Sequence, residues 1–243
     1  SVTGARTARE MYGAGGWDLW QAVLRDGRWQ DPTLLAVNTG RDEVDPFFSH
    51  DGAWLYFASN RDSGRGGLDL YGVMIGADGS FGPVLAMPVT VNTPADERRP
   101  AVRPDGQVLL FARNGKRTHG GFDLYQATAQ GRSFNSATPL PAPLNSGADE
   151  LGGDWLGNGG ALVFTRVADG HSQVWQVGCD YRQAALPLAL SFNTPDGQTG
   201  APVVDASKPS ELVVSGQARS PRAGGLDLYR MRTPVAAGGC ATP

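Results

Sequence analysis

Long apolar runs are absent from this 243-residue sequence, and lysine is nearly absent, with only Lys116 and Lys208. No run approaches the roughly 18 apolar residues that a membrane-spanning helix needs, so we expect no membrane span. The 21 basic and 24 acidic residues give a formal charge of −3, which does not indicate a nucleic-acid-binding surface. Apolar residues make up 40% of the chain, which is sufficient for a folded core.

Cysteine is also scarce, because the chain has only Cys179 and Cys240. Two cysteines are too few for a disulfide framework or a zinc site, and we expect neither a metal nor another cofactor. A bond between the two would close a loop of about 60 residues and would stabilise the fold by roughly 4 kcal/mol. It would also indicate an oxidising compartment, but the sequence leaves the pairing open. The start at Ser1, without an initiator methionine or a leader pattern, fits either a removed signal peptide or a fragment boundary.

Glycine and proline are abundant, with 34 and 17 residues, and they punctuate an internal repeat. Three strings recur at a spacing of about 50 to 54 residues. The first is a Gly-Gly-X-Asp-Leu-aromatic motif, the second an Asn-Thr/Ser loop that usually carries Asp-Glu, and the third an Asp-Gly or Asn-Gly turn. The first string reads GGWDLW at 15–20, GGLDLY at 66–71, GGFDLY at 120–125 and GGLDLY at 224–229, with a degenerate copy at Gly170.

Short segments of strand character lie between these turns, four in each repeat, and no helical periodicity separates them. This pattern is typical of propeller blades around a central axis. We therefore predict an all-β fold, a single β-propeller domain over 1–243 with five blades of four antiparallel strands. The approximate blade repeats are 1–36, 37–88, 91–141, 144–191 and 192–239.

The first and last blades are incomplete in sequence. Residues 1–6 are expected to form the second strand of the first blade, which then lacks its inner strand. The last blade lacks a clear outer strand, for which 233–239 is a candidate. Five blades with an imperfect closure is our interpretation, and a fragment of a larger ring is the alternative.

The pattern NTxxDExxPxxSxDGxxLYFASNRxxGxGGxDLY across 38–71 resembles the WD-like propeller repeat of the TolB family, which also occurs beside OmpA-like domains. The match covers nearly the whole chain, closely at 38–71 and 92–125 and more weakly toward the C-terminus. This resemblance implies a propeller of the bacterial cell envelope, periplasmic or secreted. It implies no particular activity.

Two loops of every blade lie on one face of a propeller, which we call the rim face: the loop entering the first strand and the loop joining the second strand to the third. These loops bring carboxylates and arginines together, a pairing that suits the planar guanidinium group. Because every blade has them, we interpret these residues as a structural lock between blades, although a ring of charges that binds a ligand would have the same composition. The predicted lock contains Asp42, Glu43, Asp96, Glu97, Asp149, Glu150, Arg61, Arg113, Arg166, Asp69, Asp123 and Asp227.

Residues that interrupt the repeat are the better candidates for binding. Asp154 occupies an otherwise apolar first-strand position, where a carboxylate needs a partner or a water-filled channel. We expect the channel to solvate it, with a functional role as the alternative. Arg98 and Arg99 place two positive charges at one blade's mouth and could bind an anion, or they could simply belong to the charged rim.

The histidines His119 and His171 lie in the joining loops of two blades, the repeats at 91–141 and 144–191. They are candidate binding residues, but two histidines without a third ligand are a weak metal signal. His50 lies in a turn of the opposite face and is not expected to join them. Among the tryptophans only Trp29 is expected to be an exposed contact, and the other five are expected to pack in the core.

Catalytic motifs of the common hydrolase and phosphate-loop types are absent. The sequence therefore favours a non-catalytic platform that binds a protein or an envelope polymer on one face, more consistent with a monomer than an oligomer. The alternative is a glycan-active propeller, a glycosidase or a lectin-like protein, with carboxylates in its channel. Hydrolysis would need two carboxyl groups roughly 5 to 9.5 Å apart. The first-strand carboxylates Asp45, Asp154 and Asp205 lie on different blades and specify no such pair.

Overall fold

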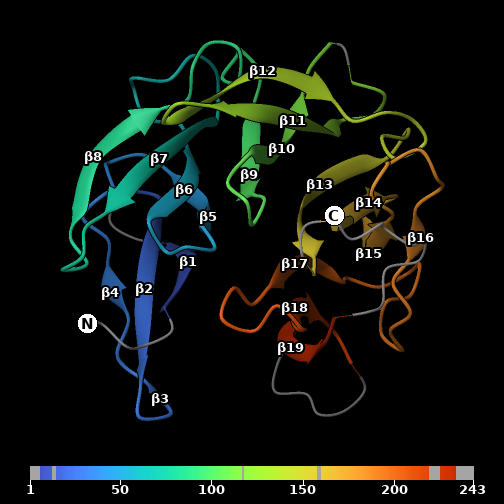
Figure 1. The fold of residues 1–243 in the computed structure, drawn as a ribbon. Helices are drawn as coiled ribbons and strands as arrows, with labels where there is room; N and C mark the ends of the chain where they lie inside the picture. The colour runs from blue at the N-terminus through green and yellow to red at the C-terminus, as the bar shows by residue number, and fades with distance from the viewer. Residues whose placement is uncertain (1–5, 13–14, 117, 158–159, 219–224, 234–243) are drawn as a thin grey trace.

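The computed structural model describes residues 6–12, 15–116, 118–157, 160–218 and 225–233. These residues form five antiparallel sheets arranged around a central axis, as Figure 1 shows. The chain is an all-β five-bladed β-propeller with blades of three or four strands, which confirms the predicted fold class. Among the described residues, no helix has the length and apolar character needed to cross a membrane.

Each sheet is one blade, and its strands follow one another in the chain. The first blade contains β1 (Arg6–Tyr12), β2 (Trp17–Arg25), β3 (Arg28–Trp29) and β4 (Thr33–Leu34). The second contains β5 (Glu43–Phe48), β6 (Trp54–Ser59), β7 (Asp69–Ile75) and β8 (Phe81–Ala86). The third contains β9 (Glu97–Val102), β10 (Val108–Asn114), β11 (Phe122–Gln130) and β12 (Ser133–Pro139). The fourth blade contains β13 (Asp149–Leu156), β14 (Ala161–Ala168), β15 (His171–Val177) and β16 (Leu186–Pro187). The fifth contains β17 (Gly200–Val204), β18 (Glu211–Gly216) and β19 (Asp227–Arg232).

The Asp-Gly turns close the hairpins between first and second strands, as the sequence predicts. Gly52 and Gly106 have φ values of 69° and 72°, which a side chain would disfavour. The Asp51 carboxylate accepts hydrogen bonds from the main-chain N–H of Ala53 and the hydroxyl of Ser49. This local bonding holds the turn and sets the strand register on both sides.

The core lies between the sheets, because neighbouring blades stack face to face. One cluster joins the first and second blades, a large one joins the second, third and fourth, and a third joins the fourth and fifth. The first strands of successive blades contact one another from β5 through β9 and β13 to β17, and β5 also contacts β1, the second strand of the first blade. Between the described strands of the fifth and first blades no comparable contact occurs, and the two sheets flank an opening in Figure 1.

The incomplete blades differ in detail from the sequence expectation. The second strand of the first blade is β1, and residues 1–5 of the predicted strand at 1–6 lie outside the described residues. Its fourth strand is split into the short β3 and β4, which pair with different parts of β2. No fourth strand pairs with β19 in the described part of the fifth blade, and most of the candidate segment 233–239 lies outside the described residues.

Candidate functional site

Glutamate and arginine pair on the rim face of three blades. In the third blade, Arg113 Nε donates to Glu97 Oε1 at 2.8 Å, and its Nη2 donates to the carbonyl of Val91. The main-chain N–H and the hydroxyl of Thr93 donate to the same carboxylate at 2.9 and 2.5 Å. Glu43 with Arg61 and Glu150 with Arg166 repeat this arrangement.

These pairs lie within a blade, not between blades as the predicted lock requires. Glu97 and Arg113 are cross-strand neighbours in the register of β9 and β10, and Glu150 and Arg166 oppose each other likewise in β13 and β14. Arg61 lies two residues beyond the end of β6 and reaches back to Glu43 on β5 of the same blade. Each guanidinium also stacks on aromatic rings of its own blade, as Arg113 does on Phe111 and Tyr125. The pair therefore fixes the loop that arrives from the preceding blade onto the first two strands.

Burial raises the pKa of Glu97 and of Glu150. Hydrogen bonds from Thr93 and Ser146, together with the facing arginines, oppose that rise without cancelling it. The two carboxyl groups are thus held at a cost in desolvation; each is buried and accepts three hydrogen bonds from protein donors. This arrangement leaves little capacity for an external ligand.

Contacts between blades come from the aspartate one residue before each of these glutamates. Asp96 Oδ1 accepts from the main-chain N–H of Leu68 in the second blade at 2.9 Å, and Oδ2 accepts from the Asn114 side chain at 2.8 Å. Asp42 and Asp149 make the same link to Trp17 and Phe122. In contrast, Asp69 and Asp123 accept bonds from their own joining loops, and Asp227 begins β19.

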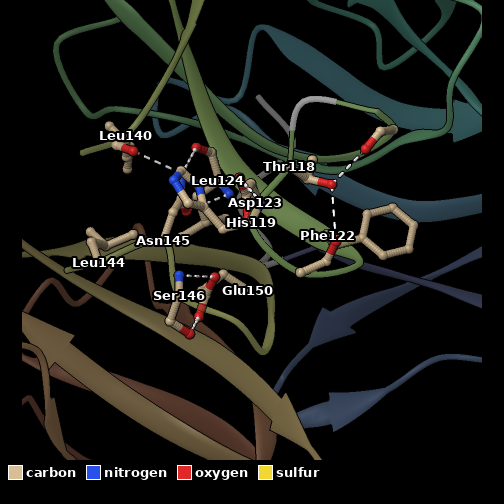
Figure 2. A network of polar contacts seen from close by, with 12 residues as sticks. Thr118, His119, Phe122, Asp123, Leu124, Leu140, Leu144, Asn145, Ser146 and Glu150 are labelled. Carbon is tan, nitrogen blue, oxygen red and sulfur yellow. Dashed lines mark hydrogen bonds and ion pairs between the residues drawn. The ribbon is translucent and has the colours of Figure 1, made fainter. Parts of the chain in front are cut away.

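A repeated asparagine makes a further inter-blade link, to which sequence reasoning assigned no role. The Asn145 side chain accepts from the N–H of Leu124 at 2.8 Å and donates to its C=O at 3.0 Å, and it also donates to the C=O of Leu140. Figure 2 shows this side chain between the third and fourth blades, beside the Ser146–Glu150 contact. Asn38, Asn92 and Asn193 do the same in the other blades. Its recurrence in every copy, even the weakest, was the available signal.

The first strands of the second, third and fifth blades share an irregularity in strand register. Asp45, Arg99 and Ala201 occupy the same position of three first strands, each with φ near 50° and each followed by proline. Such left-handed backbone is costly for these residue types and re-aims the side chain. This irregularity thus places a carboxylate and a guanidinium from neighbouring blades side by side.

Arg98 and Arg99 both face Asp45 across the second and third blades. Arg98 Nε donates to Asp45 Oδ2 at 2.8 Å, and Arg99 Nε lies 3.6 Å from Asp45 Oδ1. Two guanidinium groups therefore share one carboxylate. The role of both arginines in binding an anion stays a prediction.

Asp154 is buried, with 1% of its surface exposed, so the expectation that channel water solvates it is wrong. Its oxygens accept from the main-chain N–H groups of Trp155 and Val204, the latter in the fifth blade. His50 Nε2 lies 3.6 Å from Asp154 Oδ1 and makes no hydrogen bond within the described residues. Sequence reasoning missed the contact between His50 and Asp154, because the two residues lie on the second and fourth blades, which are not adjacent in the ring.

The other two histidines are not brought together. His119 is exposed and contacts Asp123 Oδ2 through its ring at 3.2 Å, and His171 is an exposed residue at the start of β15. The described residues contain no group of three side chains able to hold a metal ion. Cys179 is disulfide-bonded. Its predicted partner, Cys240, lies outside the described residues, so that pairing stays a prediction.

Two cavities open on opposite faces. The rim cavity, of about 480 Å³, is lined by Trp17, Asp42, Val44, Asn60, Asp96 and Arg98, with Gly67 and Leu68 at its wall. The Trp17 side chain was expected in the core, but it is 46% exposed beside this cavity. The second cavity, of about 250 Å³, lies among the opposite-face turns and includes His50, Trp54 and Arg103.

The geometry defines the class, a β-propeller with a rim cavity, and comparisons with known proteins agree at the level of fold. No protein-family model matches the sequence, and no curated protein is similar enough to count as a match. TolB from Acinetobacter baumannii shares the fold with a TM-score of 0.63 and 13% identity over 93% of this chain. The chain spans only 50% of that TolB structure.

Two further structures show the same architecture. A protein assigned as TolB in Agrobacterium tumefaciens has a TM-score of 0.60 and 16% identity, covering 94% of this chain and 77% of its own. The α-L-arabinofuranosidase Arb93A of Fusarium graminearum has a TM-score of 0.59 and 14% identity, covering 93% and 71%. At these identities the likeness extends to the fold alone.

Proposed function

We propose that the protein is a binding propeller of the bacterial cell envelope, periplasmic or secreted, which recognises a protein or an envelope polymer through its rim face. The rim cavity carries this proposal. Its volume of about 480 Å³ lies within the roughly 300 to 1,000 Å³ typical of ligand sites. The resemblance of the repeat to TolB supports the location.

The composition of the rim cavity suits a binding site. An exposed indole ring offers a large flat apolar surface, onto which a sugar ring or an apolar side chain packs. Asp42 and Asp96 stand on the same cavity, each fixed by a main-chain N–H and an asparagine amide. The Arg98 side chain, partly exposed, adds a cation that is held by Asp45. These groups are preorganised, which lowers the entropic cost of binding.

Two exposed tryptophans of the first blade give a matched test. Trp17 lines the rim cavity, whereas Trp29, 55% exposed, lies on β3 and is not among the cavity residues. Binding is measured in two ways: by co-sedimentation of the protein with purified peptidoglycan sacculi, and by its capture of proteins from an outer-membrane fraction. We expect Trp17→Ala to abolish co-sedimentation or capture and Trp29→Ala to preserve it. Equal binding by both variants, or no binding to either material, would contradict the proposal.

A glycan-active propeller remains the second candidate, because an arabinofuranosidase shares the fold and carboxylates line the rim cavity. The first-strand carboxylates are less suited to hydrolysis. Asp45 is held by two guanidinium groups, and Asp154 is held by two amides beside His50. Turnover of 4-nitrophenyl α-L-arabinofuranoside that is lost in Asp154→Asn would establish an enzyme and overturn the binding proposal.

A further inference from the structure

The fifth blade has an uncovered face that every other blade buries. The leucine of the Gly-Gly-X-Asp-Leu motif, or valine in the fourth blade, points toward the next blade. Its exposed fraction is 0% for Leu19, 1% for Leu70 and 0% for Leu124, and Val174 is likewise buried, but Leu228 is 76% exposed. Val203 on β17 is exposed as well, whereas its counterpart Ala101 is buried. An apolar sheet face is therefore left open on this side.

The main chain around Leu228 repeats the pattern of an inter-blade contact without its partner. In the second blade, the N–H and C=O of Leu70 bond to the Asn92 side chain of the following repeat at 2.9 and 3.0 Å. The motif at Leu228 has the same register against its second strand, since Ser215 opposes Leu228 as Ala58 opposes Leu70. No described asparagine reaches Leu228.

Among the described residues, Gly225, the glycine before Leu226, faces open space where the corresponding glycines of other blades lie against an aspartate of the next repeat. A Cβ added to Gly67 or Gly121 would lie 2.0 or 2.2 Å from an oxygen of the next repeat's aspartate, Asp96 or Asp149. At Gly225, the corresponding residue, such a Cβ would meet no described atom within 4 Å. Glycine is thus retained where its usual reason, the approach of a carboxylate, is missing from the described structure.

These three observations have one explanation. We propose that the exposed face of the fifth blade is a docking site for an Asn-Thr-X-X-Asp-Glu segment followed by a β-strand, presented by a further propeller repeat of the same kind. Its asparagine would bond to the main chain of Leu228, its aspartate would enter the space at Gly225 and accept from the N–H of Leu226, and its strand would cover Leu228 and Val203. The contacts continue an interface that the chain already forms between its own blades.

A second copy of this chain is not the expected occupant. Its own segments of this type are engaged in its own interfaces, through Asn38, Asn92 and Asn145. The described part of β1 also pairs only with β2, while the second strands β6, β10 and β14 each pair with a first strand as well. A docked strand therefore has an available edge on the first blade, on the other side of the opening in Figure 1.

The test uses the intact chain and a synthetic peptide of its own residues 91–102, which carry Asn92, Asp96 and Glu97, labelled for fluorescence anisotropy. We expect saturable binding. Replacing the peptide's aspartate by alanine weakens it by roughly tenfold, because a desolvated N–H loses its acceptor. Leu228→Arg and Gly225→Val in the protein are expected to weaken binding to a similar degree. Both variants should melt like the wild type, because their sites are open.

Leu186→Arg is the matched control, since Leu186 is also exposed but lies on β16 of the fourth blade. It should leave peptide binding unchanged, as should Trp17→Ala, which separates this site from the rim cavity. Absence of binding, or binding that Leu228→Arg and Gly225→Val do not weaken, would overturn the proposal.

Discussion

The third and fifth blades share the motif Gly-Gly-X-Asp-Leu-Tyr, yet one is held from both sides and the other from one. Leu124 is covered by the fourth blade, Asn145 bonds to its main chain, and Asp149 fills the space beside Gly121. Leu228 and Gly225 have the same sequence context but no such neighbours among the described residues. The comparison teaches that this motif is an adaptor for the next blade, and that it adds stability only where that blade is present.

The largest expected effect contrasts the two leucines. Leu124→Ala should lower the free energy of unfolding by about 2 to 5 kcal/mol, because it leaves a cavity in a packed core. Leu228→Ala should change it by less than about 0.5 kcal/mol, because its side chain is mainly in water. Chemical denaturation of both variants measures this. Similar losses in both would mean that the fifth blade's face is covered in solution.

The second contrast concerns the glutamate, which the fifth blade replaces by Thr199. Glu97→Ala should cost about 2 to 3 kcal/mol, because Arg113 loses its acceptor in a largely buried position. Thr199→Ala should cost about 1 kcal/mol, since it removes one hydroxyl bond to the carbonyl of Phe192. A thermal melt unchanged by Glu97→Ala and by Glu43→Ala would contradict a structural role for these pairs.

The third contrast tests the glycines. Gly121→Ala should destabilise the protein by about 1 to 2 kcal/mol, because its Cβ collides with Asp149 and forces a shift. Gly225→Ala has open space and should be neutral or stabilising by up to about 1 kcal/mol, through a less flexible unfolded chain. Equal destabilisation in a denaturant titration would show that Gly225 has a neighbour in solution.

The smallest effect is a dependence on pH. Because burial raises the pKa of Glu97 above its usual 4.5, its contribution to stability is full below about pH 4.5 and is lost as pH rises through the folded-state value. The stability advantage of the wild type over Glu97→Gln should therefore be larger at pH 4 than at pH 7. Asp105 should show the opposite sign, since its hydrogen bond from Arg103 lowers its pKa. Urea denaturation of the wild type and Glu97→Gln between pH 4 and pH 7 measures this difference in stability. A wild-type advantage that grows toward pH 7 would contradict a raised pKa for Glu97.

Much of the fold could be predicted because the repeat reports local chemistry. Asp-Gly turns, short β-rich segments and glycine pairs specify hairpins wherever they occur, so the blade count followed from counting motifs. The candidate site was harder. Asp154 and the Arg98–Arg99 pair stood out as interruptions of the repeat, but their partners Asp45 and His50 lie on other blades, and no local pattern reports that distance.

Trp17 illustrates the same limit. Its place in the motif resembles that of Leu68 and Phe122, which are both partly buried, and nothing in the local sequence marks it as exposed. Its exposure depends on the position of the first blade beside the rim cavity. Side-chain burial is a property of the neighbours, and neighbours around a ring come from repeats about 50 residues apart.

The sequence by itself determined that this chain folds into five similar antiparallel sheets, because turn chemistry and strand periodicity act over a few residues. Only the tertiary structure decided that the glutamate–arginine pairs lie within blades, that Asp154 is buried beside His50, and that the fifth blade's face is uncovered. Those outcomes depend on how rigid sheets stack around an axis, where each contact joins residues from different blades.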